Sequence, residues 1–321
     1  MAEQKLISTI VPGMSWEGYA IVRTAEVRTD KRGMQYLDMT LADRSGTINA
    51  KQWNVSRNAP QAGMLLDVTG SATEFNGRLQ FNINFYREVN DENERNAKMS
   101  LIVPSAPRTA EDMLADIRSA VASFKNNDLR KIVEELLTQA GDRLVYYPAA
   151  QRMHHAERSG LLHHTTDMLH LANQVIGCYP FLNADLLRAG VILHDLGKID
   201  EMAADQFGTV SDYTRDGNLV GHIVRGAVNI RLAAERVGVT GEAVVLLEHM
   251  LLSHHGIPEY GSPIRPMFPE AEVLHVIDSL DARMNEMESV MNRTPEGAFS
   301  EQIKALDNRR LYHARYTEGA E

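Results

Sequence analysis

The segment "ILHDLGK", residues 192–198, combines polar and apolar residues in a way that is unusual for a buried helix. It places His194 beside Asp195 between apolar residues and then turns at a glycine into Lys198. An imidazole and a carboxylate are costly to bury unless partners replace the lost water. Lys198 lies one turn after Asp195, and we expect it to reach over this site toward an anionic substrate. The alternative is that Lys198 pairs with Asp200 or Glu201 just downstream.

The distribution of the histidines indicates what stabilises His194 and Asp195 when they are buried. All 12 lie within residues 154–313. Besides "ILHDLGK", metal-competent side chains recur in apolar, helix-like segments: "GLLHHTTDML" (160–169), "GHIVRG" (221–226), "LLSHHG" (251–256) and "VIDSLDAR" (276–283). One buried histidine is typically a hydrogen-bonded core residue, but five such segments are hard to explain in that way. Neutral imidazole and carboxylate are common ligands of first-row divalent metals, so the pattern predicts a metal centre.

The composition is typical of a globular protein, with 321 residues, 44% hydrophobic and 24% charged, and the length suggests two domains. No apolar run is long enough to predict a membrane span, and the N-terminus lacks the pattern of a secretory signal. The single cysteine excludes a disulfide framework and fits a reducing cytoplasm, which is the expected location. A pI near 5.7 argues against tight, purely electrostatic binding of nucleic acid.

Residues 1–95 predict a small β-domain. Apolar and polar residues alternate over 17–29, 35–46, 47–53, 64–75 and 78–89, and turn signals such as "DKRG" and "DRSG" separate these segments. Five short strands are compatible with a small barrel or a sandwich. A five-stranded oligonucleotide-binding (OB) barrel is the candidate of the best size.

Aromatic and basic residues of this region suggest a face that stacks on bases and contacts phosphates. The candidates are Tyr36, Lys51, Trp53, Phe75, Arg78 and Phe81. Because strands send alternate side chains inward, part of this set is expected in the core instead.

The spacing of apolar residues changes from the two-residue alternation of strands to a helical period after residue 100. Residues 96–110 predict a linker, residues 111–308 an all-α domain, and residues 309–321 a peripheral tail. Helical periodicity and capping residues predict helices at about 109–124, 127–140, 158–177, 183–195, 217–237, 241–254 and 270–290. No strand pattern of comparable quality follows residue 100. The apolar helices are compatible with a homo-oligomer whose size the sequence leaves open.

The ordered set His, His-Asp, His, His-His and Asp resembles the HD superfamily of metal-dependent phosphohydrolases, an all-α fold named after its His-Asp pair. This resemblance covers about residues 154–283, and the ordered combination is highly specific. Over almost the whole chain, "LADRSGTINAKQW", "HHAERSG", "GNLVGHI", "HMLLSHHGIPEYGSP" and "AEVLHVIDSLDARM" are similar to the YhaM-type 3′-to-5′ exoribonucleases. The similarity implies their architecture, an OB-fold domain ahead of an HD domain.

The resemblance also implies a set of metal ligands. They are His164, His194, Asp195, His222, His254, His255 and Asp278. Asp195 would bridge two ions, and His255 would replace or join His254. His163 is the alternative to His164, and Asp281 is the alternative to Asp278.

The implied reaction is hydrolysis of single-stranded RNA, or of DNA, from the 3′ end to nucleoside 5′-monophosphates, with Asp195, Lys198 and His222 as catalytic candidates. His154 and His155 precede the core motif and are candidates for substrate contact. One or two divalent ions are expected, with Mn²⁺ preferred and Fe, Co, Zn or Mg as alternatives. Two other functions stay open. One is a phosphohydrolase of a dNTP or dinucleotide, and the other is a nucleic-acid-binding adaptor with an inactive HD site.

Overall fold

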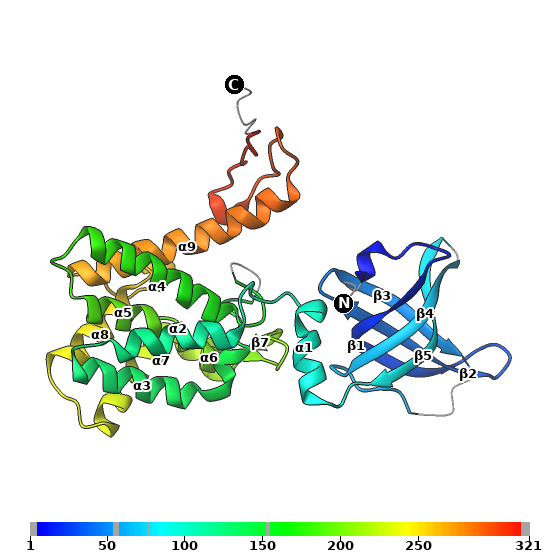
Figure 1. Cartoon of the computed structure of the whole chain (residues 1–321), viewed down its shortest axis with the longest axis horizontal. Coiled ribbons are helices and arrows are strands. Elements are labelled where there is room, and N and C mark those ends of the chain that lie inside the picture. Colours follow the sequence, from blue (N-terminus) through cyan, green and yellow to red (C-terminus); the bar gives the residue numbers. More distant parts are fainter. Residues whose placement is uncertain (1–4, 54–57, 76, 152–154, 316–321) are drawn as a thin grey trace. The chain divides into compact units, whose positions relative to one another are not determined.

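The computed structural model describes residues 5–53, 58–75, 77–151 and 155–315. The chain divides into two compact units, residues 1–105 and 106–321. Figure 1 shows long strands in the first unit and a bundle of helices in the second. Within the described ranges, no helix combines the length and the apolar character needed to cross a bilayer.

The first unit contains a closed barrel with the strand order β1-β2-β3-β5-β4. The strands are β1 (Ser15–Thr29), β2 (Gln35–Asp43), β3 (Gly46–Trp53), β4 (Leu65–Phe75) and β5 (Arg78–Glu88). Neighbouring strands are antiparallel except β3 and β5, which pair in parallel where Ala50 lies opposite Phe81. The predicted strands and the OB-like barrel are confirmed.

The core of the barrel follows from the two-residue period of its strands. Trp16 and Phe81 are buried, and their rings meet edge to face with centroids 5.7 Å apart. Gln80 and Asn82, on either side of Phe81, are partly exposed. The prediction that Phe81 belongs to the stacking face is therefore wrong, because the alternation turns this ring into the core.

A helix follows the barrel directly. Helix α1 (Glu92–Ile102) packs against β1, and Met99 and Ile102 are buried. Its first turn is held by an ion pair between Glu94 and Arg87 of β5. The second half of α1 thus occupies part of the predicted linker, and the division between the two units falls after residue 105.

The second unit consists of the helices that the sequence period predicts, together with the short α6. They are α2 (Ala110–Ala122), α3 (Asn127–Ala140), α4 (Gly160–Cys178), α5 (Ala184–Leu193), α6 (Lys198–Glu201), α7 (Arg215–Arg236), α8 (Glu242–Ser253) and α9 (Pro269–Arg293). The side chains of Thr109, Asn126, Asn183 and Thr214 cap four of them. A small hairpin, β6 (Met202–Ala204) and β7 (Val210–Tyr213), was not expected, because its strands are too short for an alternation pattern.

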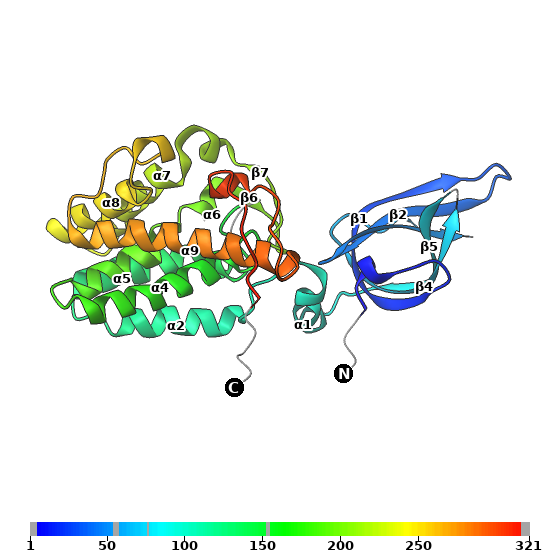
Figure 2. The ribbon, with the colours of Figure 1, turned by 90° about the horizontal axis from the view of Figure 1, so that it is seen from above.

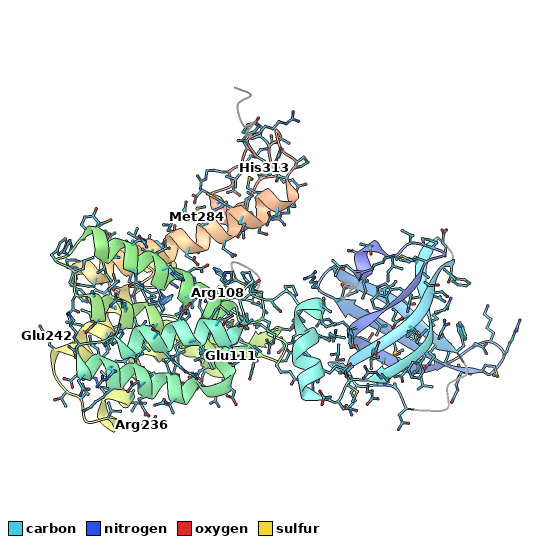
Figure 3. All side chains as sticks on the ribbon, viewed as in Figure 1. Arg108, Glu111, Arg236, Glu242, Met284 and His313 are labelled. Atoms are coloured by element: carbon cyan, nitrogen blue, oxygen red, sulfur yellow. The ribbon has the colours of Figure 1, made fainter. Side chains whose placement is uncertain are left out.

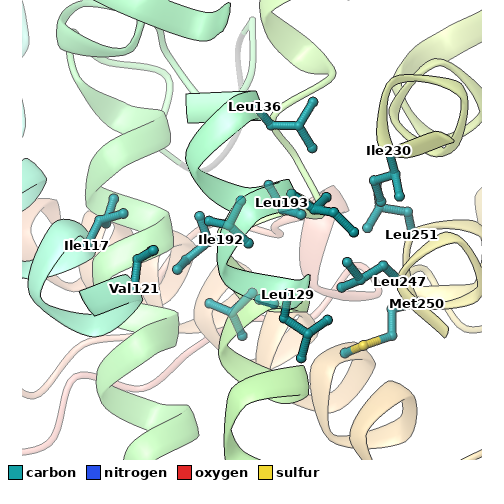
Figure 4. Packing of buried hydrophobic residues seen from close by; sticks show 14 of the residues in the cluster. Ile117, Val121, Leu129, Leu136, Ile192, Leu193, Ile230, Leu247, Met250 and Leu251 are labelled. Carbon is teal, nitrogen blue, oxygen red and sulfur yellow. The ribbon is translucent and has the colours of Figure 1, made fainter. Parts of the chain in front are cut away.

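Helix α5 lies in the middle of the helical core. Residues 189–193 are all buried, which is typical of a helix surrounded by others. Figure 4 shows Ile192 and Leu193 among apolar side chains of the neighbouring helices, including Ile117 of α2 and Leu247 of α8. Because α5 ends at Leu193, this packing holds the next two residues, the His-Asp pair, in a rigid position.

The C-terminal segment packs on the end of α9. Isolated β-bridges join Phe299 to Tyr312 and Ile303 to Arg309. Figure 2 shows this segment, in red, beside the last turns of α9 in orange. His313, labelled in Figure 3, donates from Nδ1 to the C-cap carbonyl of α9 over 2.7 Å. Residues 309–313, at the start of the predicted tail, therefore take part in tertiary packing.

Gly70 of β4 provides a test of the barrel packing, because a Cβ atom there would collide with Asn82 O and lie 2.7 Å from the Phe81 ring. We expect Gly70→Ala to lower the free energy of unfolding of the barrel by about 1–3 kcal/mol, the scale of core overpacking. Both tryptophans lie in barrel strands, so tryptophan fluorescence in a urea titration reports on this unit. Gly177→Ala, at an open position of α4, is the control. An unchanged midpoint for Gly70→Ala would contradict the tight contact.

Candidate metal centre

The candidate ligands come from different helices and meet at one place. They are His164 in α4, His194 and Asp195 after α5, His222 in α7, His254 after α8 and Asp278 in α9. Four of them are buried almost completely, and the side chains of the other two, His222 and Asp278, are only 12% and 14% exposed. Segments separated by more than 100 residues thus build one polar cluster inside an apolar core.

One oxygen of Asp195 belongs to a first group of ligands. Asp195 Oδ2 lies 3.4 Å from His194 Nε2 and 3.7 Å from His164 Nε2. Asp278 Oδ1 completes the group at 3.3 Å from His164 Nε2. Atoms that surround a single ion with bonds of about 2 Å are separated by distances of this order. The first group therefore fits one divalent ion.

The other oxygen of Asp195 faces a second group. Asp195 Oδ1 lies 3.5 Å from His222 Nε2 and 3.8 Å from His254 Nε2. These three atoms are buried and make no hydrogen bond to any described residue. Since buried polar atoms are nearly always paired, the arrangement calls for a cation among them. Asp195 is thus placed to bridge two ions.

Hydrogen bonds on the far side of each ring set its direction. Each ring donates a hydrogen bond from Nδ1–H to an oxygen outside the centre. The pairs are His164 to Asp281 Oδ2 (2.6 Å), His194 to Val191 O (2.9 Å), His222 to Glu201 Oε1 (3.0 Å) and His254 to Leu251 O (2.7 Å). Because all four partners accept, each ring keeps a proton on Nδ1 and presents Nε2 to the centre. Such outer partners orient metal-binding imidazoles.

Two carboxylates change the proton affinity of His164. Burial lowers the pKa of this ring, but the bonds to Asp278 and Asp281 more than offset burial and raise the pKa to about 10. A metal ligand must be a neutral imidazole, so metal binding at Nε2 would release a proton. Asp281 supports His164 from behind, whereas Asp278 faces the centre.

Glu201 and a glycine determine the position of His222. Gly221 interrupts α7 with a φ of 73°, in the left-handed region that glycine adopts without strain. Glu201 Oε1 then accepts from both the backbone N and the ring Nδ1 of His222, each over 3.0 Å. From the sequence, Glu201 is expected only as a partner of Lys198. The sequence signal that could have drawn attention to Glu201 is its spacing of three residues from Lys198, about one helical turn.

Lys198 donates to Asp195 Oδ2 over 2.7 Å. It therefore pairs with neither of the two downstream carboxylates that the sequence offered, and its contact with an anionic substrate stays a prediction. Burial lowers the pKa of Lys198, but the Asp195 charge more than offsets burial and raises it. A fixed positive charge thus lies beside the carboxylate on which both groups converge.

The remaining predicted residues lie at the edges of the centre or outside it. The His255 ring is 4.2 Å from the His254 ring and 5.5 Å from the His222 ring, centroid to centroid, so it lies with the second group. His155 is only 3% exposed, and its Nε2 lies 2.8 Å from Asp281 Oδ2. His155 therefore lies behind the centre, against Asp281, and its contact with substrate stays a prediction. His154 is outside the described residues.

The barrel carries a separate candidate surface. Tyr36 and Trp53 lie opposite each other on β2 and β3, with ring centroids 4.8 Å apart. Lys51 Nζ lies 5.3 Å from the first ring and 5.9 Å from the second. Trp53 is 44% exposed and Phe75 is 61% exposed. Flat rings beside a cation suit the stacking of bases. The side chain of Arg78 is outside the described part of the chain.

Several known proteins are similar to this chain. A family model described as HD domain matches residues 161–283. One similar solved structure is the second OB-fold domain of replication protein A from Methanococcus maripaludis. It is 21% identical, the match covers 28% of this chain and 98% of that chain, and the TM-score is 0.25. The 3′-5′ exoribonuclease YhaM of Bacillus pumilus is 37% identical over 318 residues, 98% of this chain and 99% of that protein. YhaM of Bacillus licheniformis is 39% identical over 300 residues, 92% of this chain and 93% of that protein. With such identity along nearly the whole length, the chain belongs to the YhaM family of 3′-5′ exoribonucleases.

Proposed function

We propose that this chain is a metal-dependent 3′-to-5′ exonuclease that hydrolyses single-stranded RNA, with single-stranded DNA as the alternative substrate, to nucleoside 5′-monophosphates. The observation that carries the proposal is the buried Asp195 carboxylate, whose two oxygens face two groups of imidazole Nε2 atoms. The names of the YhaM relatives supply the direction of cleavage and the class of substrate.

Dependence on a divalent metal follows from the HD domain and from its clusters of histidine and aspartate. The first ion would be held by His164, His194, Asp195 and Asp278, and the second by Asp195, His222, His254 and His255. We propose Mn²⁺ as the native ion, with Fe, Co, Zn or Mg as alternatives, because imidazole nitrogens and carboxylate oxygens without sulfur accept any of these metals.

The protein's side chains prepare the centre for hydrolysis. A bound metal would supply hydroxide at neutral pH, because it lowers the pKa of its water toward neutrality. Asp281 and Glu201 hold His164 and His222 with their Nε2 atoms toward the centre. Lys198 keeps a positive charge beside Asp195, where it favours the negative charge that develops on the phosphoryl oxygens.

The barrel surface supports a polymer as the substrate. Stacking on Tyr36 and Trp53 would hold any base, because every base has an aromatic face, and Lys51 would meet the phosphate backbone. A dNTP bound at the metal centre would not need a second surface for stacking. The net charge of the chain, −10, fits this division, because the bound metals rather than basic side chains would supply the positive charge for catalysis.

A labelling assay tests the proposed direction. Purified protein with Mn²⁺ receives single-stranded RNA labelled at the 3′ end or at the 5′ end, and separately a panel of dNTPs. We expect the 3′ label to appear at once as a mononucleotide, while the 5′-labelled strand shortens gradually.

Asp195→Ala should abolish this reaction and the binding of both ions at the centre, whereas His222→Ala should lose the second ion only, as counted by elemental analysis. His170→Ala, an exposed histidine of α4, is the control. Hydrolysis of dNTPs without RNA degradation would contradict the proposal.

The positive charge of Lys198 can be tested separately from metal binding. We expect Lys198→Ala to lower turnover by roughly 10²–10³, the scale of losing one charge-stabilising donor, with the metal content unchanged. Lys131→Ala, on the exposed side of α3, should keep full activity. A loss of less than about threefold for Lys198→Ala would leave this lysine with a structural role only.

Removal of one ring tests the barrel surface. Trp53→Ala should weaken the binding of single-stranded RNA roughly tenfold, because stacking on an aromatic ring contributes about 1–3 kcal/mol per base. Hydrolysis of bis-p-nitrophenyl phosphate, which needs no strand binding, should not change. Phe181→Ala, an exposed aromatic residue of the helical unit, is the matched control. Equal RNA affinity in all three proteins would exclude the Trp53 surface as the RNA-binding site.

A further inference from the structure

The loop between α8 and α9 is fixed to a candidate metal ligand. His255 donates from Nδ1 to the backbone carbonyl of Tyr260 over 2.7 Å, and its backbone N donates to Ser262 Oγ over 3.0 Å. Ser262 is completely buried. A Cβ atom at Gly261 would lie 3.7 Å from Cδ1 of Ile223 in α7. The loop therefore packs against the second group of ligands.

The conformation of this loop is restricted. Its first part, Pro258–Tyr260, forms a short 3₁₀ turn. Gly261 follows with a φ of 101°, in the left-handed region that other residues adopt only with strain. Pro263 and Pro266 fix φ at two further positions. A segment held in this way loses little conformational freedom when a ligand binds to it.

The same loop lies on the exposed side of the centre. Four of the candidate ligands are buried, and the other three are partly exposed, namely His222, His255 and Asp278. Solvent reaches Asp195 past these three side chains. Two of them, His222 and His255, lie with the second group, against which the loop packs. A strand that enters the centre from this side therefore passes the loop.

Tyr260 carries an aromatic ring on this side of the centre. It is 67% exposed, and its side chain makes neither a hydrogen bond nor a ring contact with any described residue. One exposed aromatic residue needs no explanation by itself. Tyr260 is different because its own carbonyl is bonded to His255, so its ring stays within one side-chain length of the second group. Proteins hold unpaired bases by stacking them on such free rings.

We propose that Tyr260 stacks on the base of the 3′-terminal nucleotide. This inference rests on the proposed exonuclease function and names the residue that would hold the nucleotide to be released. The last nucleotide has no successor, so a contact of its own is needed to select the end of the strand, whereas upstream bases also have the barrel surface. Because every base has an aromatic face, the contact is independent of sequence.

The test compares strands that differ in a single base. Full-length protein with Mn²⁺ is titrated with fluorescent RNA whose last linkage is a methylenephosphonate that resists hydrolysis. The RNA is complete, abasic at the 3′-terminal nucleotide or abasic at the penultimate one. We expect Tyr260→Ala to weaken binding of the complete strand roughly tenfold, within the range of stacking on one ring, and to leave binding of the terminally abasic strand unchanged. Tyr260→Phe keeps the ring and should bind every strand as the unaltered chain does.

The barrel meets the same upstream bases in the complete and the terminally abasic strand, so its contribution cancels in the comparison. The unaltered chain should itself bind the complete strand roughly tenfold more tightly than the terminally abasic one, which decides the question even if Tyr260→Ala does not fold. Tyr179→Ala is the matched control, because this exposed tyrosine follows the end of α4, about four turns beyond His164, and it should bind normally.

The metal content should stay the same in Tyr260→Ala, because the carbonyl that holds His255 belongs to the backbone. Three results would overturn the proposal: no loss of affinity, an equal loss for the complete and the terminally abasic strand, or a loss that follows the penultimate base. Affinity is measured here without hydrolysis. These results are therefore distinct from an absence of RNA degradation, which would contradict the exonuclease proposal itself.

Discussion

The burial of the Asp195 carboxylate is the constraint on which the helical unit depends. A charged oxygen in an apolar core is tolerated only with close positive partners. Burial alone would raise the pKa of Asp195, but the charges of Lys198 and His194 hold it well below its usual value. The position of this carboxylate is set by the buried face of α5, which ends one residue before His194. The packing of the core therefore also sets the position of the central ligand.

The ring directions show how the fold prepares the centre in advance. Each of the four central imidazoles donates from Nδ1 to an oxygen behind it, which belongs to a carboxylate or to a backbone carbonyl. The rings need no reorientation to present Nε2, so little conformational freedom is lost when a ligand binds. His155 has the opposite orientation, with its Nε2 bonded to a carboxylate. Asp281 accepts from both His155 and His164.

The two units divide charge and chemistry between them. Residues 1–100 contain no histidine and carry 12 basic and 12 acidic side chains, so they contribute no net charge. The partly exposed ring of Tyr36 and the exposed ring of Trp53 suit binding through stacking, which depends little on net charge. The second unit carries every candidate ligand within its own core. An acidic chain can in this way act on an anionic polymer.

The long strands and helices could be predicted from the sequence because each follows a local period of apolar residues, and the candidate ligands could be named because the order of the histidines and aspartates resembles the HD superfamily. Alternation over two residues marked the five barrel strands, and the helical period with its caps marked the long helices of the second unit. Tertiary structure decided what local patterns do not contain. Alternation does not say which face of β5 turns inward, so only the closed barrel buried Phe81. Spacing left Asp278 and Asp281 as alternatives, and the docking of α9 against α4 separated them by placing one before His164 and the other behind it. The partner of Lys198 was decided in the same way, because burial makes the nearest charged oxygen, that of Asp195, the strongest attraction.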